Sequence, residues 1–199
     1  MKPIDFWFSI GSTYTFLSVM RLPTLAMEHD LSVNWRPFNV RTILVEQNNI
    51  PFAGKPVKAA YMWRDIERRA GKYGLSLAVP APYPLEFLPL ANQVALLGMR
   101  EGWGQDYVLA TYRRWFRLGL PAGSEPNLSA SLTEIGQDPD RAILAARSPA
   151  IEEALSVETD EARRLGVFGA PCFVVEGEVF WGDDRLEDAV SWARSGRVL

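Results

Sequence analysis

The start of the chain contains two strand-like segments on either side of a helix-like segment. Residues 4–10 alternate between two faces that both carry large apolar side chains, which is typical of a central β-strand. Residues 13–29 then carry apolar side chains at helical spacing, with Pro23 expected to kink or split the helix, and residues 33–38 alternate again. This order predicts two parallel strands joined by a right-handed crossover.

The end of the chain has a different order. Residues 172–176 and 178–180 are rich in β-formers on either side of Gly177, which predicts a hairpin, and residues 183–194 have a helical pattern. Helical patterns between the two ends cover residues 56–73, 88–101, 105–118, 128–135, 139–147 and 150–165, and the proline-rich residues 78–89 are expected to be irregular. The order βαβ…ββα predicts an α/β protein with a thioredoxin-like fold and a large all-helical insertion. We expect residues 1–55 and 166–199 to form the thioredoxin-like domain, and residues 56–165 the helical insertion domain.

Charge and residue counts argue against several classes of protein. A net charge of −3, with both signs mixed along the chain, argues against a nucleic-acid surface, which needs a basic stripe. The chain has one cysteine, Cys172, and one histidine, His29, so it has no intramolecular disulfide or CxxC pair, and no metal site is expected. No signal peptide and no apolar run of about 18 residues is visible, so we expect no membrane span and a cytoplasmic location.

Ser12 lies between the first strand and the first helix, at the strand end where α/β proteins commonly bind ligands. The free amides and the dipole of a helix N-terminus favour negative charge, so a bound thiolate is stabilised there. The alternative is that Ser12 is only the N-cap of the helix.

Pro171 and its neighbours allow two interpretations. A proline directly before a strand is a candidate for a cis peptide bond that exposes the backbone near Cys172 to an extended peptide, and the alternative is an ordinary loop proline. We expect Cys172 itself to be a small buried core residue. Trp7, Trp35 and Trp181 either belong to the core or line a pocket for an aromatic substrate.

The charged residues at the start of the last helix and of the middle helix can each be interpreted in two ways. Asp184 and Glu187 fit a capping box, while Asp183 or Asp184 could instead hold an ammonium group. Lys58 opens the middle helix, where the dipole disfavours a cation, so it is either solvated or in contact with an anion.

Several segments together resemble one family, the 2-hydroxychromene-2-carboxylate isomerases and the related kappa-class glutathione transferases. The similar segments are residues 5–14 (DFWFSIGSTY), 169–173 (GAPCF) and 180–186 (FWGDDRL), together with the spacing of Asn49, Lys58, Tyr61 and Asp65. The chain departs from the family pattern at Thr13, where proline is usual, and at Cys172, where threonine is frequent.

The resemblance implies glutathione as a cofactor. Ser12 would be the catalytic residue, in contact with the glutathione sulfur. The glutathione-binding residues it implies are Asn49, Lys58, Ala170, Pro171, Cys172, Asp183 and Asp184. Among these, the backbone around Cys172 would pair with the cysteinyl unit, and Asp183 and Asp184 would hold the γ-glutamyl end.

The resemblance also implies an activity, which is a glutathione-dependent cis–trans isomerisation of an aromatic keto acid of the 2-hydroxychromene-2-carboxylate type. It further suggests a homodimer. One alternative is a kappa-type transferase or peroxidase, in which glutathione is consumed. Another is a non-enzymatic binding protein in which Ser12 is only a cap. The cysteine at position 172 leaves a mixed disulfide with glutathione open.

Overall fold

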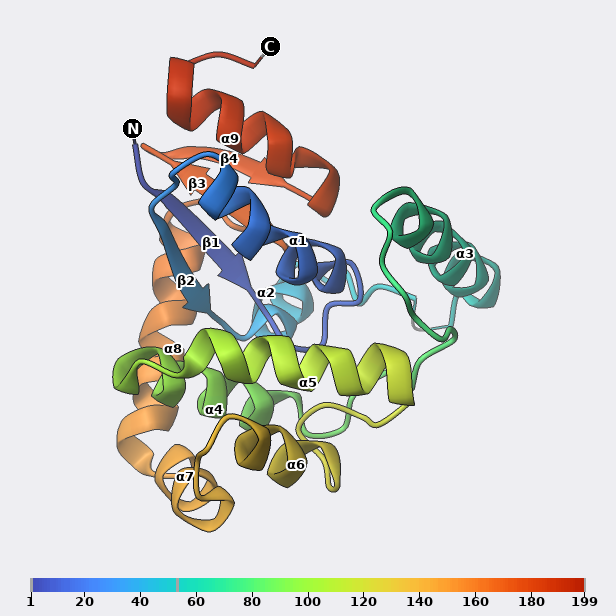
Figure 1. The fold of residues 1–199 in the computed structure, drawn as a ribbon, viewed down its shortest axis with the longest axis vertical. Coiled ribbons are helices and arrows are strands. Elements are labelled where there is room, and N and C mark those ends of the chain that lie inside the picture. Colours follow the sequence, from blue (N-terminus) through green and yellow to red (C-terminus); the bar gives the residue numbers. More distant parts are fainter. Residues whose placement is uncertain (1, 53, 199) are drawn as a thin grey trace.

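A four-stranded sheet lies at the centre of the computed structural model, which describes residues 2–52 and 54–198 (Figure 1). The strands are β1 (Ile4–Phe8), β2 (Val33–Pro37), β3 (Cys172–Val175) and β4 (Glu178–Trp181), in the order β2-β1-β3-β4. The pair β1–β2 is parallel, with Ile4 opposite Val33, and β1–β3 is antiparallel, with Trp7 opposite Cys172. The parallel pair and the central place of β1 agree with the sequence prediction.

The described helices include every one that the sequence predicts and one that it does not, α2. They are α1 (Thr15–Glu28), α2 (Val40–Glu46), α3 (Pro56–Lys72), α4 (Leu88–Glu101), α5 (Gly104–Leu118), α6 (Asn127–Glu134), α7 (Pro139–Ala146), α8 (Pro149–Arg164) and α9 (Leu186–Ser195). Of the two expectations for Pro23, a kink or a split of the first helix, the split is wrong, because α1 is continuous through that position. No helix in residues 2–52 and 54–198 is long and apolar enough to cross a membrane.

The two faces of the sheet bury different side chains. Phe6 and Phe8 face the larger core, which continues through α1, α9 and the helical segment to Tyr107 and Trp115. Trp7 and Cys172 face the other side, where α2 and α8 cover them. The main core therefore spans both parts of the chain, and the division into domains at residues 55 and 165 stays a prediction from the sequence.

The C-terminal segment confirms the hairpin and changes the start of the last helix. Glu176 and Gly177 connect β3 to β4 with φ angles of 51° and 88°, and two positive φ angles are what a type I′ turn requires. The predicted capping box of Asp184 and Glu187 is wrong, because a 3₁₀ turn, η1 (Asp183–Arg185), precedes α9. Glu187 instead pairs with Arg21 on α1.

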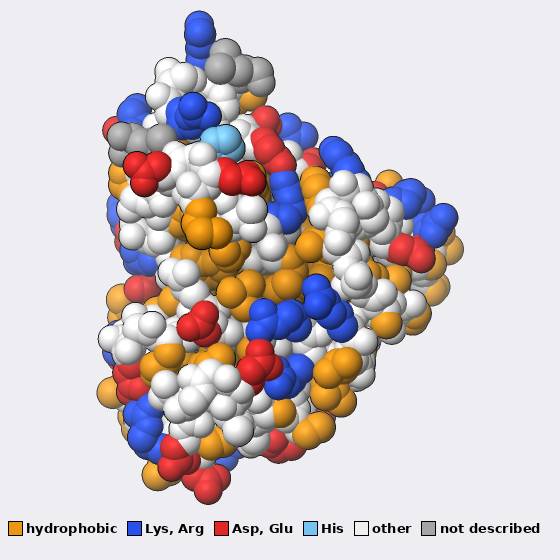
Figure 2. Space-filling view, viewed as in Figure 1, with side chains coloured by type: hydrophobic (Ala, Val, Ile, Leu, Met, Phe, Trp, Pro, Cys, Tyr) orange, Lys and Arg blue, Asp and Glu red, His pale blue; other side chains and the backbone are white. Residues whose placement is uncertain are grey.

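The surface in Figure 2 mixes charges of both signs. On this face hydrophobic side chains gather in the middle, between α1, α5 and α3, and acidic and basic side chains are interspersed over the rest. In Figure 1, α3 stands beside this region at the edge of the molecule, connected to the rest of the chain by long loops.

Candidate functional site

A cavity of about 390 Å³ opens at the carboxyl end of β1, a size within the usual range for small-molecule sites. Its wall comes from six parts of the chain: the loop after β1, helix α2 with the segment that follows it, the start of α3, the proline-rich segment up to the start of α4, the loop before β3, and the end of β4. The lining residues are Gly11, Ser12, Thr13, Tyr14, Val40, Arg41, Leu44, Asn49, Ile50, Pro51, Phe52, Lys58, Tyr61, Met62, Tyr83, Leu88, Phe168, Gly169, Ala170 and Trp181.

Ser12 lines this cavity and does not cap the helix. Helix α1 begins after Tyr14, which makes no side-chain capping bond, and the hydroxyl of Ser12 donates instead to the carbonyl oxygen of Ala170 at 2.8 Å. The interpretation of Ser12 as an N-cap is therefore wrong. The hydrogen bond joins residues 158 positions apart and links the loop after β1 to the loop before β3 at the cavity wall.

The loop that carries Ser12 is held from the helical segment. Asn92 on α4 is fully buried and pairs with the backbone of Ile10 in both directions, at 2.8 and 3.1 Å. The hydroxyl of Tyr112 on α5 lies 3.1 Å from the carbonyl oxygens of both Ser9 and Ser12. Neither residue belongs to a sequence motif, and both are recognisable only from the fold.

Gly11 allows the loop to pass close to α4. Its φ angle is 132°, and a Cβ atom there would lie 2.3 Å from Cδ1 of Leu88. A side chain at this position would be strained by the backbone and would also collide with the helix that supports the loop.

The Ala170–Pro171 peptide bond is cis, as one of the two interpretations of Pro171 expected. Gly169 and Ala170 line the cavity, while Pro171 and Cys172 are buried behind it. The backbone that faces the cavity is therefore that of the two residues before Pro171 rather than that around Cys172.

Cys172 is a core residue, in agreement with the sequence interpretation. Its thiol is fully buried and lies 3.1 Å from the carbonyl oxygen of Gly169. Burial raises the pKa of this thiol to about 12, so it is a poor nucleophile at neutral pH.

Asn49, in the segment between α2 and α3, and Lys58, in the first turn of α3, both reach the cavity. Both are exposed and both line the cavity. The Lys58 ammonium has no carboxylate partner among the described residues and lies 5.8 Å from the centre of the Phe52 ring. If Lys58 binds an anion, that anion must therefore belong to a ligand.

Asp183 and Asp184 lie outside the cavity wall. Asp183 is 1% exposed, and its carboxylate lies 2.7 Å from the guanidinium of Arg69 on α3. This arrangement leaves Asp183 no surface for an ammonium group. Asp184 is exposed and its carboxylate is 3.2 Å from Arg185, at the turn that follows the cavity residue Trp181.

Of the three tryptophans considered for an aromatic pocket, one lines the cavity. Trp181 is half exposed and packs at a tilt of 58° against Phe168, another lining residue, with 4.9 Å between the ring centres. Trp7 and Trp35 are buried on opposite faces of the sheet. Among residues 2–52 and 54–198, no group of three or more His, Cys, Asp and Glu side chains is placed to hold a metal ion.

Sequence reasoning did not find the contribution of α2 to the site. Val40, Arg41 and Leu44 all line the cavity, and the proline-rich segment adds Tyr83. Burial raises the pKa of the Tyr83 phenol, and the positive charge of Arg41 opposes that effect. A helical prediction for residues 40–46 would have placed Leu44 beside both Val40 and Arg41, which precede it by four and three positions.

Comparison with known proteins gives consistent similarities over nearly the whole chain. The sequence pattern of the DSBA-like thioredoxin domain matches residues 3–191. A 2-hydroxychromene-2-carboxylate isomerase of Sphingobium xenophagum is 30% identical over 188 residues, which are 94% of this chain and 95% of that protein. Glutathione S-transferase kappa 2 of Caenorhabditis elegans is 22% identical over 200 residues, with 93% and 88% covered. A solved 2-hydroxychromene-2-carboxylate isomerase structure matches with a TM-score of 0.82 at 25% identity, covering 92% of this chain and 90% of that one.

Proposed function

Because the chain belongs to the DSBA-like thioredoxin domain family and is related within it to 2-hydroxychromene-2-carboxylate isomerases and kappa glutathione transferases, we propose that it is a glutathione-dependent isomerase of an aromatic keto acid. The substrate is of the 2-hydroxychromene-2-carboxylate type, after the name of the relatives. The product is the open-chain o-hydroxybenzylidenepyruvate type of compound.

One observation carries the proposal. Ser12 holds a hydroxyl at the end of β1, next to the first turn of α1 and in hydrogen-bond contact with the residue before a cis proline. The amides of Phe16 and Leu17 in the first turn of α1 donate to the carbonyl oxygens of Thr13 and Tyr14, so it is the dipole of α1 that favours an anion beside this turn. A bound thiolate at this point receives both stabilising effects, whereas Cys172 is buried and cannot supply one from the chain itself.

The residues of the cavity fit glutathione. The Ala170 carbonyl is an acceptor for a peptide amide, as in strand addition, once Ser12 turns its proton away from it. Lys58 supplies an unpaired cation for a carboxylate, and Asn49 supplies an exposed amide. Asp184 lies outside the cavity wall, where it is exposed beside Arg185, and it is the carboxylate proposed for the ammonium group because Asp183 is paired with Arg69.

When bound, glutathione supplies a thiolate that adds reversibly to a conjugated carbon of the substrate, so that the bond can rotate before the thiolate leaves. The Ser12 hydroxyl would donate a hydrogen bond to the sulfur, which would lower the free energy of the thiolate. The aromatic and aliphatic wall formed by Phe168, Trp181 and Leu44 contacts the substrate ring and excludes water from it.

Replacement of Ser12 by alanine tests this function. A hydrogen bond to a charged group is worth about 1.5–3 kcal/mol, so kcat/KM should fall by roughly 10- to 100-fold. The measurement is the glutathione-dependent isomerisation of 2-hydroxychromene-2-carboxylate, with Ser195→Ala on the exposed end of α9 as the control that keeps the wild-type rate. Full activity without glutathione, or an unchanged rate in Ser12→Ala, would contradict the proposal.

The similarity to a kappa-class transferase supports a second candidate. A transferase or peroxidase consumes glutathione in proportion to product, while an isomerase leaves its concentration unchanged. Titration of free thiol during turnover separates the two activities. The non-enzymatic alternative is tested by calorimetry, in which an absence of glutathione binding at millimolar concentration would favour it.

A further inference from the structure

The cavity wall has an unbalanced charge. Among its described residues are two cations, Arg41 and Lys58, and no aspartate or glutamate. Neither cation has a carboxylate partner elsewhere in the described part of the chain. A cavity with two uncompensated positive charges and an otherwise mostly apolar wall favours ligands that bring two anionic groups. Lys58 accounts for one of these groups in the proposed glutathione site, and Arg41 has no assigned ligand.

Arg41 is held in place by its helix. The side chain of Asn39 accepts a hydrogen bond from the Arg41 amide at 3.2 Å, and the Asn39 amide donates to Thr159 of α8 at 3.0 Å. At the other end of α2, Glu46 makes two hydrogen bonds with Arg163, at 3.0 and 2.8 Å. Both ends of α2 are therefore tied to α8, so the backbone position of Arg41 is set before any ligand arrives.

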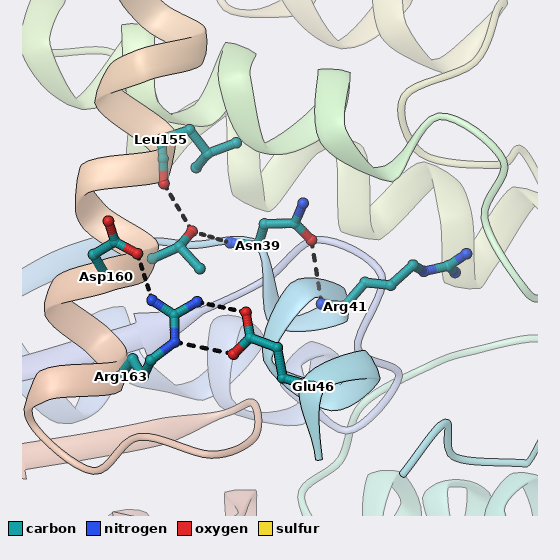
Figure 3. A network of polar contacts seen from close by, with 7 residues as sticks. Asn39, Arg41, Glu46, Leu155, Asp160 and Arg163 are labelled. Carbon is teal, nitrogen blue, oxygen red and sulfur yellow. Dashed lines mark hydrogen bonds and ion pairs between the residues drawn. The ribbon is translucent and has the colours of Figure 1, made fainter. Parts of the chain in front are cut away.

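The guanidinium of Arg41 points away from these contacts. Figure 3 shows its side chain extending out of the polar network, while its backbone remains part of it. On the same helix Val40 and Leu44 line the cavity, and Tyr83 packs edge-on to Phe52 with 6.1 Å between the ring centres. A planar cation beside apolar and aromatic side chains suits a carboxylate attached to an aromatic or conjugated system.

We propose that Arg41 binds the carboxylate of the substrate and makes the site selective for conjugated aromatic acids over neutral aromatic electrophiles. This inference rests on the proposed function, because that function is the reason to assign Arg41 to the substrate carboxylate rather than to glutathione. It predicts two separable anion subsites on one wall, with Lys58 for glutathione and Arg41 for the acid.

The test compares Arg41→Met, Arg41→Lys and Lys58→Met with the wild type. Loss of a charge-assisted pair should raise the KM for the keto acid by about 10- to 100-fold in Arg41→Met. The same variant should show an unchanged KM for glutathione and an unchanged rate with the methyl ester of the substrate. Arg41→Lys should recover part of the loss, and Lys58→Met should affect the glutathione KM alone. Arg147→Met, an exposed arginine at the end of α7, is the matched control.

Calorimetry with a simple probe keeps the inference testable even if the isomerase activity is absent. Cinnamate should bind the wild type more tightly than cinnamamide, and Arg41→Met should abolish that difference while Arg147→Met keeps it. Equal affinities of the wild type for cinnamate and cinnamamide would overturn the role of Arg41. An equal loss of activity with the keto acid and with its methyl ester in Arg41→Met would also overturn it. Failure of turnover with retained cinnamate selectivity would overturn the proposed function alone.

Discussion

Cys172 shows how burial decides the chemistry of a residue. The same residue type is a nucleophile when its thiolate is accessible and a packing group when it is not. Here the thiol is fully buried, close to the carbonyl oxygen of Gly169, and its pKa is raised to about 12 by burial. The structure therefore gives no support to a mixed disulfide between Cys172 and glutathione.

Thiol labelling checks this conclusion. At pH 8 we expect iodoacetamide to modify native Cys172 at least about 100-fold more slowly than the protein unfolded in guanidinium, because only the thiolate reacts. Mass spectrometry gives the modified fraction over time. Native labelling as fast as that of the unfolded chain would mean that Cys172 is accessible, and the mixed disulfide would return as a hypothesis.

Helix α4 supports the loop of the candidate site from outside the sheet. The Asn92 side chain accepts a hydrogen bond from the backbone amide of Ile10, just after the first strand, and donates one to the Ile10 carbonyl oxygen. It also donates to the Leu88 carbonyl oxygen at 2.9 Å. In this way the side chain continues the strand pairing where no neighbouring strand reaches. The helical segment therefore has a structural role at the site as well as lining it.

Replacement of Asn92 by alanine should destabilise the protein by about 2–4 kcal/mol, because it leaves buried backbone groups without partners. Urea unfolding followed by circular dichroism gives the free energy. Asn34→Ala is the control, since Asn34 makes one exposed hydrogen bond, to Asp5, and should cost less than about 1 kcal/mol. Equal effects of the two substitutions would mean that water replaces the contacts of Asn92.

Across the whole molecule, one ion pair, one hydrogen bond and one cation–π contact tie α3 and the residue that follows it to both ends of the chain. Asp183 joins the C-terminal η1 turn to Arg69 on α3, and Tyr14 of the first loop donates to Asp65 on the same helix at 3.0 Å. The guanidinium of Arg21 on α1 lies 3.6 Å from the centre of the Tyr73 ring. These contacts hold the helix whose first turns carry Lys58 and Tyr61 against the cavity.

The Asp183 carboxyl gives a pH dependence with a definite sign. Burial raises its pKa from 3.8 to about 6, against the opposing effect of Arg69. Between these two values the folded protein binds more protons at this site than the unfolded chain does. Its contribution to stability is therefore fully present below about pH 4 and is lost as the pH rises through about 6.

Asp183→Asn removes this titration. We expect the variant and the wild type to have similar unfolding free energies near pH 4, and the variant to be more stable by up to about 3 kcal/mol at pH 7, because two pKa units correspond to roughly that energy. Urea unfolding at pH 4, 5, 6 and 7 measures the difference, with the exposed Asp184→Asn as the control. A variant less stable than the wild type at pH 7 would show that the pair with Arg69 outweighs the cost of burial.

Local pattern was sufficient for much of the framework. The alternation of residues 4–10 predicted a strand with two buried faces, and β1 lies between β2 and β3. Gly177 predicted the tight turn of the hairpin. The strand follows from the two-residue alternation of its side chains, and the turn follows from the positive φ angle that glycine allows. Both effects act over a few residues, so they are visible in the sequence without the fold. The short helix α2 was not predicted, since contacts with α8 at both of its ends stabilise it.

Some features of the candidate site were likewise visible in the sequence, and others only in the fold. Sequence alone established that Ser12 follows the first strand and that the chain lacks a second cysteine, and the family pattern added Asn49, Lys58 and Ala170, which line one cavity. The fold was needed to see that Ser12 contacts Ala170, that Arg41 faces the same cavity, and that Asp183 is buried against Arg69. The reason is that the role of a polar or charged side chain depends on its burial and on its partner, and here the partners of Ser12 and Asp183 lie more than 100 positions away in the sequence.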